Sequence, residues 1–410
     1  MNRKKSLRCL WIAGLLLGLC GQSNADTHVQ QDLYLDAMRS ITEGRQDDAS
    51  EALTRMIEQE PQHAGAWLDL AIIQCELGHA AEAERLFQTI EARFAPPPAI
   101  LEVISHMRAH GCTGWQPRSS LSLMVGRGMD SNVNQGASNP NFSIGTGGSR
   151  IELQLLPEYM PRSDHYTVVS AEYLRDLTTN GSIGFVQARV QQNDTLSSFN
   201  TSSLALGLEH PWRFGNWGVR GTGMAALFGL GGQLYQRQAQ IQARITPPLP
   251  LPNHLQFNML AGLSHLEYAT LQNFDSNTWE LRGLLSYRTE RGLVEASVGH
   301  LTDRALSARP GGDRDGWFAS LYGRTRLGGD VIGELGWTRQ TWVSQSAYSP
   351  GLISQIRNQD TQVLRGALII PIRPHHSINV ELRQVHNNEN ISIFQYNSRQ
   401  LQVSWQWQGF

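Results

Sequence analysis

The side chains that could perform catalysis in this 410-residue chain are few and widely separated. The sequence contains no GxSxG, HExxH, Walker or CxxC motif, so nucleophile, metal and phosphate chemistry have no local signature. His375 and His376 are adjacent, but a zinc site needs at least a third ligand. We therefore expect no enzymatic activity, no metal and no cofactor. A triad assembled in space is the alternative that the sequence leaves open, and its candidates are His165, His210, His265, His300 and His386.

A second set of polar side chains is arranged for recognition rather than for reaction. Between residues 238 and 245, Gln and Arg occupy the even positions, whereas Ala and Ile occupy the odd ones. This alternation predicts a β-strand with one polar and one apolar face, as in a soluble sandwich or a transmembrane barrel with a polar lumen. In a barrel these charges would line a conduit or pair with one another and hold the lumen open or filled. The residues expected to face the lumen are Arg189, Gln236, Gln238, Gln240, Arg244, Glu280, Arg282, Glu295, Arg324, Glu334, Glu381 and Arg383.

Three features of the chain after Pro117 favour the barrel over the sandwich. The strand-like segments are long and similar in length, short and long turns alternate, and aromatic residues lie near strand ends as in a membrane girdle. Those aromatic residues are Trp212, Trp217, Trp279, Trp317 and Trp342. We count fourteen strands between residues 118 and 410. This count makes 129–163 one long loop, although Ile151–Leu156 inside it also has a strand-like pattern.

The even number of strands places both ends of the barrel on the same side of the membrane, and the location of the helical domain decides which side that is. If the preceding helical domain is periplasmic, the short turns are periplasmic and the long loops, near residues 303–315 and 344–360, are outside. The chain ends LQVSWQWQGF, in which Leu401, Val403 and Trp405 would face lipid. Phe410 is the kind of terminal aromatic residue that marks a strand for outer-membrane barrel assembly, although its parity is lumenal.

Residues 1–25 have the pattern of a secretory signal peptide, with a basic start, a short apolar segment and small residues before Ala25. Lipid attachment at Cys20 is a weaker alternative, because bulky Leu19 precedes it. Cleavage after Ala25 removes four basic residues and changes the formal net charge from −2 to −6. Cys75 and Cys112 would then lie in an oxidising compartment, either as a disulfide or as two buried thiols.

Residues 26–117 have helical periodicity and an internal repeat of 34 residues. The period and its alternation of small and large residues are typical of tetratricopeptide repeats, in which small residues let paired helices approach. A third helix near residues 100–109 would cap the two repeats. The segment contains 15 acidic residues against 6 Arg, which indicates a solvated surface or a groove for a basic or extended polypeptide. The residues expected to pack the repeats are Gly44, Ala49, Trp67, Ala71, Gly78, Ala83 and Phe87.

Two short motifs resemble those of a known family. Residues 130–134, DSNVN, resemble the D-S-N-x-N motif that follows the first strand in surface lipoprotein assembly modulators, the Slam family. Residues 390–399 resemble the closing S-N-x-x-x-Y-x-Y-x-R segment of the family, with Glu389 and Phe394 departing from its usual Ser and Tyr. The motif positions are Asp130, Ser131, Asn132, Asn134, Asn390, Tyr396 and Arg399, and the last strand ends at Phe410.

The resemblance implies an α+β multidomain protein, with a short all-α tetratricopeptide domain at 26–117 and a 14-stranded antiparallel transmembrane β-barrel at 118–410. It also implies a protein that moves client proteins, often lipoproteins, to or across the Gram-negative outer membrane, with no nucleotide cofactor. The partners would be a client surface protein or lipoprotein, the barrel-assembly machinery and outer-membrane lipid, with no nucleic acid. The alternative is an exopolysaccharide export porin with a tetratricopeptide scaffold. A passive porin is the third alternative and an outer-membrane enzyme is the fourth.

Overall fold

The computed structural model describes residues 25–409 apart from 113, 146–149 and 253. The predicted signal peptide, except for Ala25, and the predicted assembly mark Phe410 therefore lie outside the described residues. The chain divides into two compact units, Met1–Gly114 and Trp115–Phe410, and each is described by itself. No helix in the described part of the chain is both long enough and apolar enough to span a membrane.

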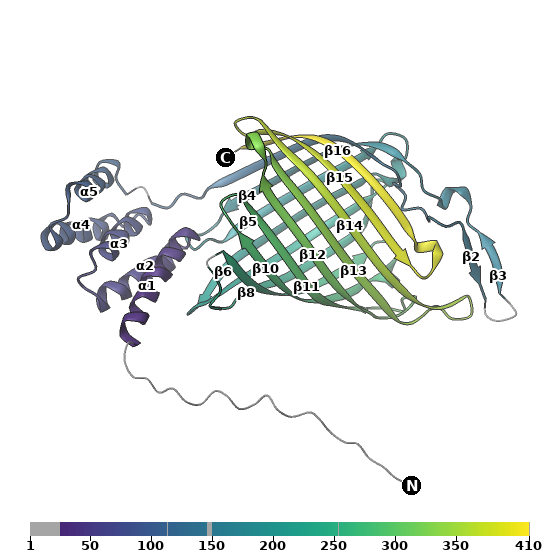
Figure 1. Ribbon diagram of the computed structural model, residues 1–410, viewed down its shortest axis with the longest axis horizontal. Coiled ribbons are helices and arrows are strands. Elements are labelled where there is room, and N and C mark those ends of the chain that lie inside the picture. The colour runs from purple at the N-terminus through teal and green to yellow at the C-terminus, as the bar shows by residue number, and fades with distance from the viewer. Residues whose placement is uncertain (1–24, 113, 146–149, 253, 410) are drawn as a thin grey trace, which may run out of the picture. The chain divides into compact units, whose positions relative to one another are not determined.

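The first unit is a stack of five helices (Figure 1). They are α1 (Ala25–Thr42), α2 (Gln46–Gln59), α3 (Ala64–Glu76), α4 (Ala80–Phe94) and α5 (Pro98–His110). Gly44 and Gly78, which are 34 residues apart, lie in the α1–α2 and α3–α4 turns with φ of 72° and 84°. Positive φ is inexpensive for glycine, so both helix pairs turn in the same way. The predicted cap near residues 100–109 is confirmed as α5.

The core of this unit contains most of the predicted packing residues. Ala49, Ala71, Ala83 and Phe87 are 0–2% exposed, and the absence of long side chains at the three alanines lets the helices approach closely. Trp67 is half-buried, donates its Nε1–H to the carbonyl oxygen of Pro61 at 3.1 Å and lies beside Phe94. The 34-residue repeat of the sequence therefore corresponds, in the structure, to equivalent turns and to equivalent close contacts at small residues.

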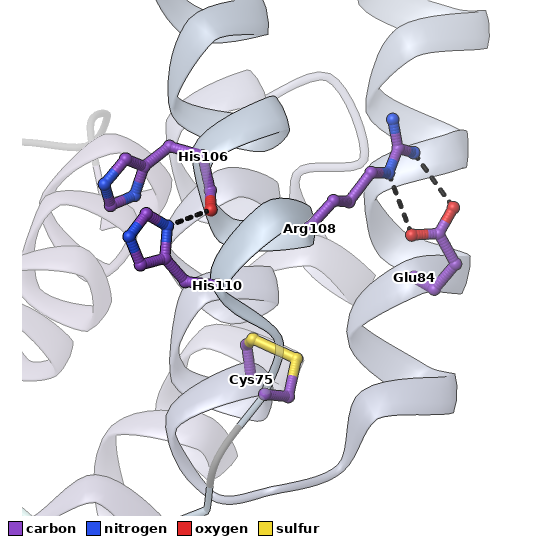
Figure 2. Close-up of a disulfide and its surroundings, with 6 residues drawn as sticks. Cys75, Glu84, His106, Arg108 and His110 are labelled. Atoms are coloured by element: carbon purple, nitrogen blue, oxygen red, sulfur yellow. Dashed lines mark hydrogen bonds and ion pairs between the residues drawn. A yellow bond between two sulfur atoms is a disulfide. The ribbon is translucent and has the colours of Figure 1, made fainter.

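A disulfide joins Cys75, near the end of α3, to Cys112, which follows α5 (Figure 2). On the same helix α5, Arg108 reaches back to α4, with Nε 2.9 Å from a carboxylate oxygen of Glu84 and Nη1 2.8 Å from Glu91. The sequence left two arrangements open for the cysteines, and the structure has the disulfide. The cap is consequently tied to the second repeat by a covalent bond and by ion pairs.

The second unit is a closed antiparallel barrel of fourteen strands, as the sequence predicts (Figure 1). The strands are β1 (Ser119–Asp130), β4 (Asp164–Asp176), β5 (Ile183–Asn193), β6 (Thr201–Phe214), β7 (Trp217–Leu230), β8 (Gln233–Thr246), β9 (Leu255–Tyr268), β10 (Ser276–Arg288), β11 (Gly292–Ala305), β12 (Arg314–Arg326), β13 (Ile332–Ser349), β14 (Ile353–Arg373), β15 (His376–Glu389) and β16 (Tyr396–Gly409). Each strand pairs with its neighbours in chain order, and β1 pairs with β16 to close the barrel.

The barrel has two different ends. The end at which β1 finishes carries residues 131–163, and we call it the loop end. The opposite end, at which β1 begins, is called the turn end. The first connection at the loop end contains a separate hairpin of β2 (Asn141–Ile144) and β3 (Ile151–Gln154), which extends beyond the barrel strands (Figure 1). The strand-like pattern of Ile151–Leu156 is thus real, but its strand pairs outside the barrel and leaves the count of fourteen unchanged.

One prediction about the loop end is wrong in detail. Most of 344–360 is not a loop, because β13 and β14 continue past the rest of the barrel to a short turn between Ser349 and Ile353. The pairing there has register shifts, and this irregularity obscures the alternation in the sequence. The connection predicted near 303–315 is present, and it runs from 306 to 313 because β11 and β12 extend a few residues into the predicted range.

The two faces of the barrel differ in chemistry. Large apolar side chains such as Ile241, Leu335 and Leu382 are 60–63% exposed on the outer face. The alternate positions of the same strands point inward, because successive strand residues face opposite sides of a sheet. Trp212, Trp217, Trp279 and Trp317 are 44–60% exposed, near strand ends. Trp342 is only 7% exposed and points inward, which corrects its place in the predicted aromatic girdle.

Candidate functional site

The interior of the barrel brings several predicted polar residues into one network. Arg365 on β14 has Nη1 3.0 Å from Glu334 and Nη2 2.8 Å from Glu381, so it joins β13 to β15. Arg324 on β12 is 3.7 Å from the same Glu334. The cluster contains two guanidinium groups and two carboxylates, so its own charges balance. Arg365 was not among the predicted residues, although it alternates with the outward-facing Leu364.

A hollow of about 650 Å³ lies beside this network, and we call it the lumenal hollow. Its lining comes from β5 and from β12 to β16, and β5 and β12 are seven positions apart in the closed order of fourteen strands. Strands from opposite sides of the barrel therefore line a single space, which shows that the interior is narrow at this level. The polar and aromatic residues of the lining are Arg189, Gln191, Phe318, Ser320, Tyr322, Thr338, Arg365, Glu381, Arg383 and Gln400.

The other predicted lumenal residues are not part of the lining of the hollow. Arg282 forms an ion pair with Glu280 on the same strand and stacks on Phe318, with its guanidinium carbon 3.7 Å from the ring centroid. Glu295 accepts a hydrogen bond from the Ser286 hydroxyl at 3.2 Å. The remaining four residues occupy even positions of β8, on the face opposite the exposed Ile241; they are Gln236, Gln238, Gln240 and Arg244. They form a separate part of the wall, away from the Arg365 network.

A buried ionic cluster lies at the loop end and was not predicted from the sequence. Asp303 is 0% exposed and accepts from Arg309 at 2.7 Å and from Arg314 at 2.6 Å. Arg314 also stacks on Trp342, 4.5 Å from its ring centroid. In the sequence these charged residues lie in the segment 303–315, which has the composition of an ordinary loop because it contains Asp, Gly, Pro and Ser, all frequent in turns. The one signal in the sequence was that Asp303 continues the alternation of inward-facing and outward-facing residues along β11.

A similar cluster on the neighbouring strands restricts the same end of the interior. Arg357 on β14 donates to the carboxylate of Glu389 on β15 at 2.9 and 2.6 Å and stacks on Phe394 at 4.3 Å. The side chain of Glu389 is fully buried. Because a buried carboxylate needs its partners to offset its desolvation, these pairs hold the loop-end wall in one arrangement.

The first family-like motif lies at the junction between β1 and β16. Asp130 accepts from the Asn132 backbone N–H at 2.8 Å, from the Ser398 hydroxyl at 2.7 Å and from the Gln400 amide at 2.7 Å. Ser131 donates its backbone N–H to the Arg399 carbonyl oxygen and accepts the Arg399 N–H. Asp130 thus bonds to residues about 270 positions later and fastens the closing strand pair.

Asn132 uses its whole amide group within the loop end. It is 2% exposed, and its Nδ2 donates to the carbonyl oxygens of Gly136 at 3.0 Å and Asn397 at 2.9 Å, while its Oδ1 accepts from the Gly136 N–H at 2.7 Å. Asn134 makes an equivalent bridge across the first connection, donating to the Met160 carbonyl oxygen at 2.9 Å and accepting the Arg162 N–H. Asn132 therefore ties the start of the long connection to β16, and Asn134 ties the start of the connection to its end.

The second motif meets the first at the same end of the barrel. The Asn390 amide donates to the Ile356 carbonyl oxygen at 2.7 Å and accepts the Asn358 N–H at 2.8 Å, which secures the end of β15 to β14. Tyr396 is half-buried on the inner face of β16, and Arg399 contributes its backbone while its side chain is exposed. The motif residues therefore hold the loop end and the strand closure together, whereas the predicted lumenal residues line a separate region.

The five candidate histidines, His165, His210, His265, His300 and His386, lie on five different strands, β4, β6, β9, β11 and β15. His375 and His376 lie at the β14–β15 turn, where His376 stacks on Trp405 at 5.5 Å. His210 is 2.5 Å from the Ser182 hydroxyl, His265 is 2.7 Å from Asn277 and 3.2 Å from Glu267, and these contacts lie on different strands. Within the described ranges, no group of three His, Cys, Asp or Glu residues has a metal-binding arrangement.

Comparison with known proteins identifies the repeat of the helical unit. The model of the tetratricopeptide repeat matches residues 40–105, which confirms the repeat predicted from the 34-residue period. No curated protein matches the chain.

The barrel also has counterparts among solved structures. OccAB3 of Acinetobacter baumannii is 9% identical with a TM-score of 0.38, over 71% of this chain and 99% of that one. A loop-deletion mutant of the outer membrane protein OmpT of Vibrio cholerae is 7% identical with a TM-score of 0.38, over 72% and 99%. An anion-selective porin of Comamonas acidovorans is 9% identical with a TM-score of 0.37, over the same shares. The chain itself is a tetratricopeptide helical unit followed by a closed fourteen-stranded antiparallel barrel.

Proposed function

We propose that this protein is a transport factor of the Gram-negative outer membrane that receives a client surface protein or lipoprotein through its helical unit and delivers it to or across the membrane. The observation that carries the proposal is the presence, on one chain, of a tetratricopeptide unit and a closed barrel with an apolar outside and a polar, hollow inside. A barrel that acts alone would not explain the presence of the helical unit, and a helical unit that acts alone would not explain the barrel.

The membrane assignment rests on the surface of the barrel. Its exposed apolar side chains and its tryptophans near strand ends match the lipid-facing band and aromatic girdle of outer-membrane barrels. In such barrels the short turns face the periplasm. The connection from α5 leads directly into the turn end of β1, so the helical unit would be attached on the periplasmic side.

The client assignment rests on the helical unit. Stacked helical repeats use extended concave surfaces to bind other chains. Leu35, Leu101 and Val103 are apolar yet 63%, 42% and 38% exposed, so this unit offers apolar contacts in an acidic surrounding. An extended or basic segment of a client would complement that surface. The barrel-assembly machinery would be a partner during insertion, outer-membrane lipid would surround the barrel, and nucleic acid is not a partner.

The test is to delete the gene and compare the cell surface by proteomics, with a glycan stain alongside. Loss of one or a few exposed proteins with glycans intact is expected. A chain that lacks residues 28–110 should restore the barrel in the membrane but not the exposed client. Loss of extracellular polysaccharide with unchanged surface proteins would contradict the proposal and favour export of a glycan. Normal client display by the shortened chain would contradict the receiving role of the helical unit.

A further inference from the structure

The lumenal hollow carries more positive than negative charge. Its lining includes three guanidinium groups, from Arg189, Arg365 and Arg383, and one carboxylate, from Glu381. Glu381 is already engaged by Arg365 at 2.8 Å, and Arg365 also engages Glu334. Arg189 and Arg383 have no ion pair with any residue that the structure describes. The hollow thus keeps two cations without a protein counterion.

The strand register places like charges side by side. Arg383 on β15 is directly opposite Arg365 on β14, and its neighbour on the other side is the uncharged Gln400 on β16. Like charges directly opposite each other on neighbouring strands destabilise a sheet. One of these two arginines is offset by Glu334 and Glu381, whereas Arg383 is not. A solute anion is the group that would complete this arrangement.

The position of Arg189 gives the hollow a second wall. Arg189 lies on β5, four strands away from Arg383 in the closed order, and both line the same space. A solute in this narrow part of the interior therefore meets guanidinium groups from more than one side. Guanidinium groups bind carboxylate and phosphate oxygens through paired N–H donors.

We propose that the lumenal hollow is an anion-binding site, which takes carboxylate- or phosphate-bearing solutes through Arg189 and Arg383 and makes the barrel interior anion-selective. The inference concerns the barrel alone and does not depend on the delivery of a client. It adds a selectivity to the interior that the balanced Arg324–Glu334–Arg365–Glu381 network would not supply.

The first experiment measures ion selectivity of the full-length protein in planar lipid bilayers under a potassium chloride gradient. The wild-type protein should have a chloride-to-potassium permeability ratio above one, on the order of threefold. The double variant R189E/R383E should have a ratio below one, and R189K/R383K should resemble the wild type. Arg237→Glu is the matched control, because Arg237 occupies an outward-facing position on β8. A cation-selective wild type, or an equal shift in the control, would overturn the proposal.

The second experiment does not require the interior to conduct. Citrate should raise the temperature at which the folded barrel loses its compact electrophoretic mobility, compared with chloride at equal ionic strength, because a ligand that binds the folded state stabilises it. R189Q/R383Q should fold with the same mobility and lose the citrate effect, whereas R237Q should retain it. An absence of conduction combined with equal effects of citrate and chloride on the wild type would contradict an anion site.

Discussion

At the scale of single residues, Asn132 is the most buried member of the DSNVN motif, and its amide makes three hydrogen bonds. Replacing its amide by a carboxylate, Asn132→Asp, would direct an oxygen at the carbonyl oxygens of Gly136 and Asn397, where two donated hydrogen bonds now exist. Loss of buried hydrogen bonds costs about 1–3 kcal/mol. We expect trypsin to cleave the first connection, at Arg150 or Arg162, faster in this variant than in the wild type.

The matched control for that change is Asn139→Asp. The Asn139 side chain uses its oxygen to accept the Asn141 N–H, and a carboxylate keeps this bond. Cleavage of the control should proceed as in the wild type. Equal protection of the Asn132 variant would show that the amide donors do not hold the connection.

Gly128 illustrates a second residue-scale constraint, imposed by a neighbouring ring. A β-carbon at this position would lie 2.5 Å from Cζ of Tyr166, whose side chain is 2% exposed on the adjacent strand. Overpacking of this kind costs about 1–3 kcal/mol. Gly128→Ala should therefore lower the temperature at which the barrel unfolds in detergent, measured by its electrophoretic mobility after heating.

Gly366→Ala is the control for Gly128, because an added β-carbon there meets no atom within 4 Å. It should leave the unfolding temperature near that of the wild type. If both variants unfold alike, the contact between Gly128 and the Tyr166 ring has no effect on stability.

At the scale of elements, the disulfide ties α3 to the segment that follows α5. The bond spans 37 residues, and disulfides of this kind contribute about 2–4 kcal/mol. The double variant C75S/C112S should shift the helical thermal transition, followed by circular dichroism at 222 nm on the full chain, to lower temperature. Dithiothreitol should produce a similar shift in the wild type and none in the variant. An unchanged transition in the variant would show that packing alone fixes α5.

The ion pair between α4 and α5 gives the helical unit a dependence on acid. The hydrogen bond from Arg108 holds the pKa of Glu84 below its ordinary value of 4.5. Because the folded pKa is lowered, the stabilisation is present above pH 4.5 and is lost as the pH falls through the folded value. Both side chains are about a third or more exposed, so the effect is at most about 1 kcal/mol.

The corresponding variant is Glu84→Gln. It should melt at a slightly lower temperature than the wild type at pH 7, and the difference should shrink toward pH 3. The control is Glu58→Gln on α2, whose side chain has no ion pair among the residues described. A difference between Glu84→Gln and the wild type that does not change with pH would contradict the ion-pair explanation.

The sequence predicted most of these elements for identifiable reasons. Alternation in the even positions of β8 is regular because one face meets an apolar surrounding and the other a polar one, so strand and inward face could both be assigned. The extension of β13 and β14 was missed because its register shifts break the alternation. Pairing of Cys75 with Cys112, and of Asp130 with Ser398, depends on distances that no local pattern contains.

At the scale of the whole molecule, the two units are separately compact, so the barrel should not need the helices in order to form. We expect a chain without residues 28–110 to reach the membrane fraction and to show the same heat-dependent change in electrophoretic mobility as the full chain. Failure of this shortened chain to fold, while the full chain does, would show that the helical unit assists barrel formation.

The pairing of β1 with β16 also has a consequence for the order of events during biogenesis. Ser122 accepts a hydrogen bond from Gln406 across a sequence separation of 284 residues, so the first strand of the barrel acquires its last neighbour only after all the others have been supplied. Contacts of such high separation form slowly. Until then the sheet has two unpaired edges, which are prone to aggregate in water. The unclosed polypeptide must therefore be protected from aggregation until β16 is in place, and its dependence on escorting chaperones should be greatest just before β16 arrives.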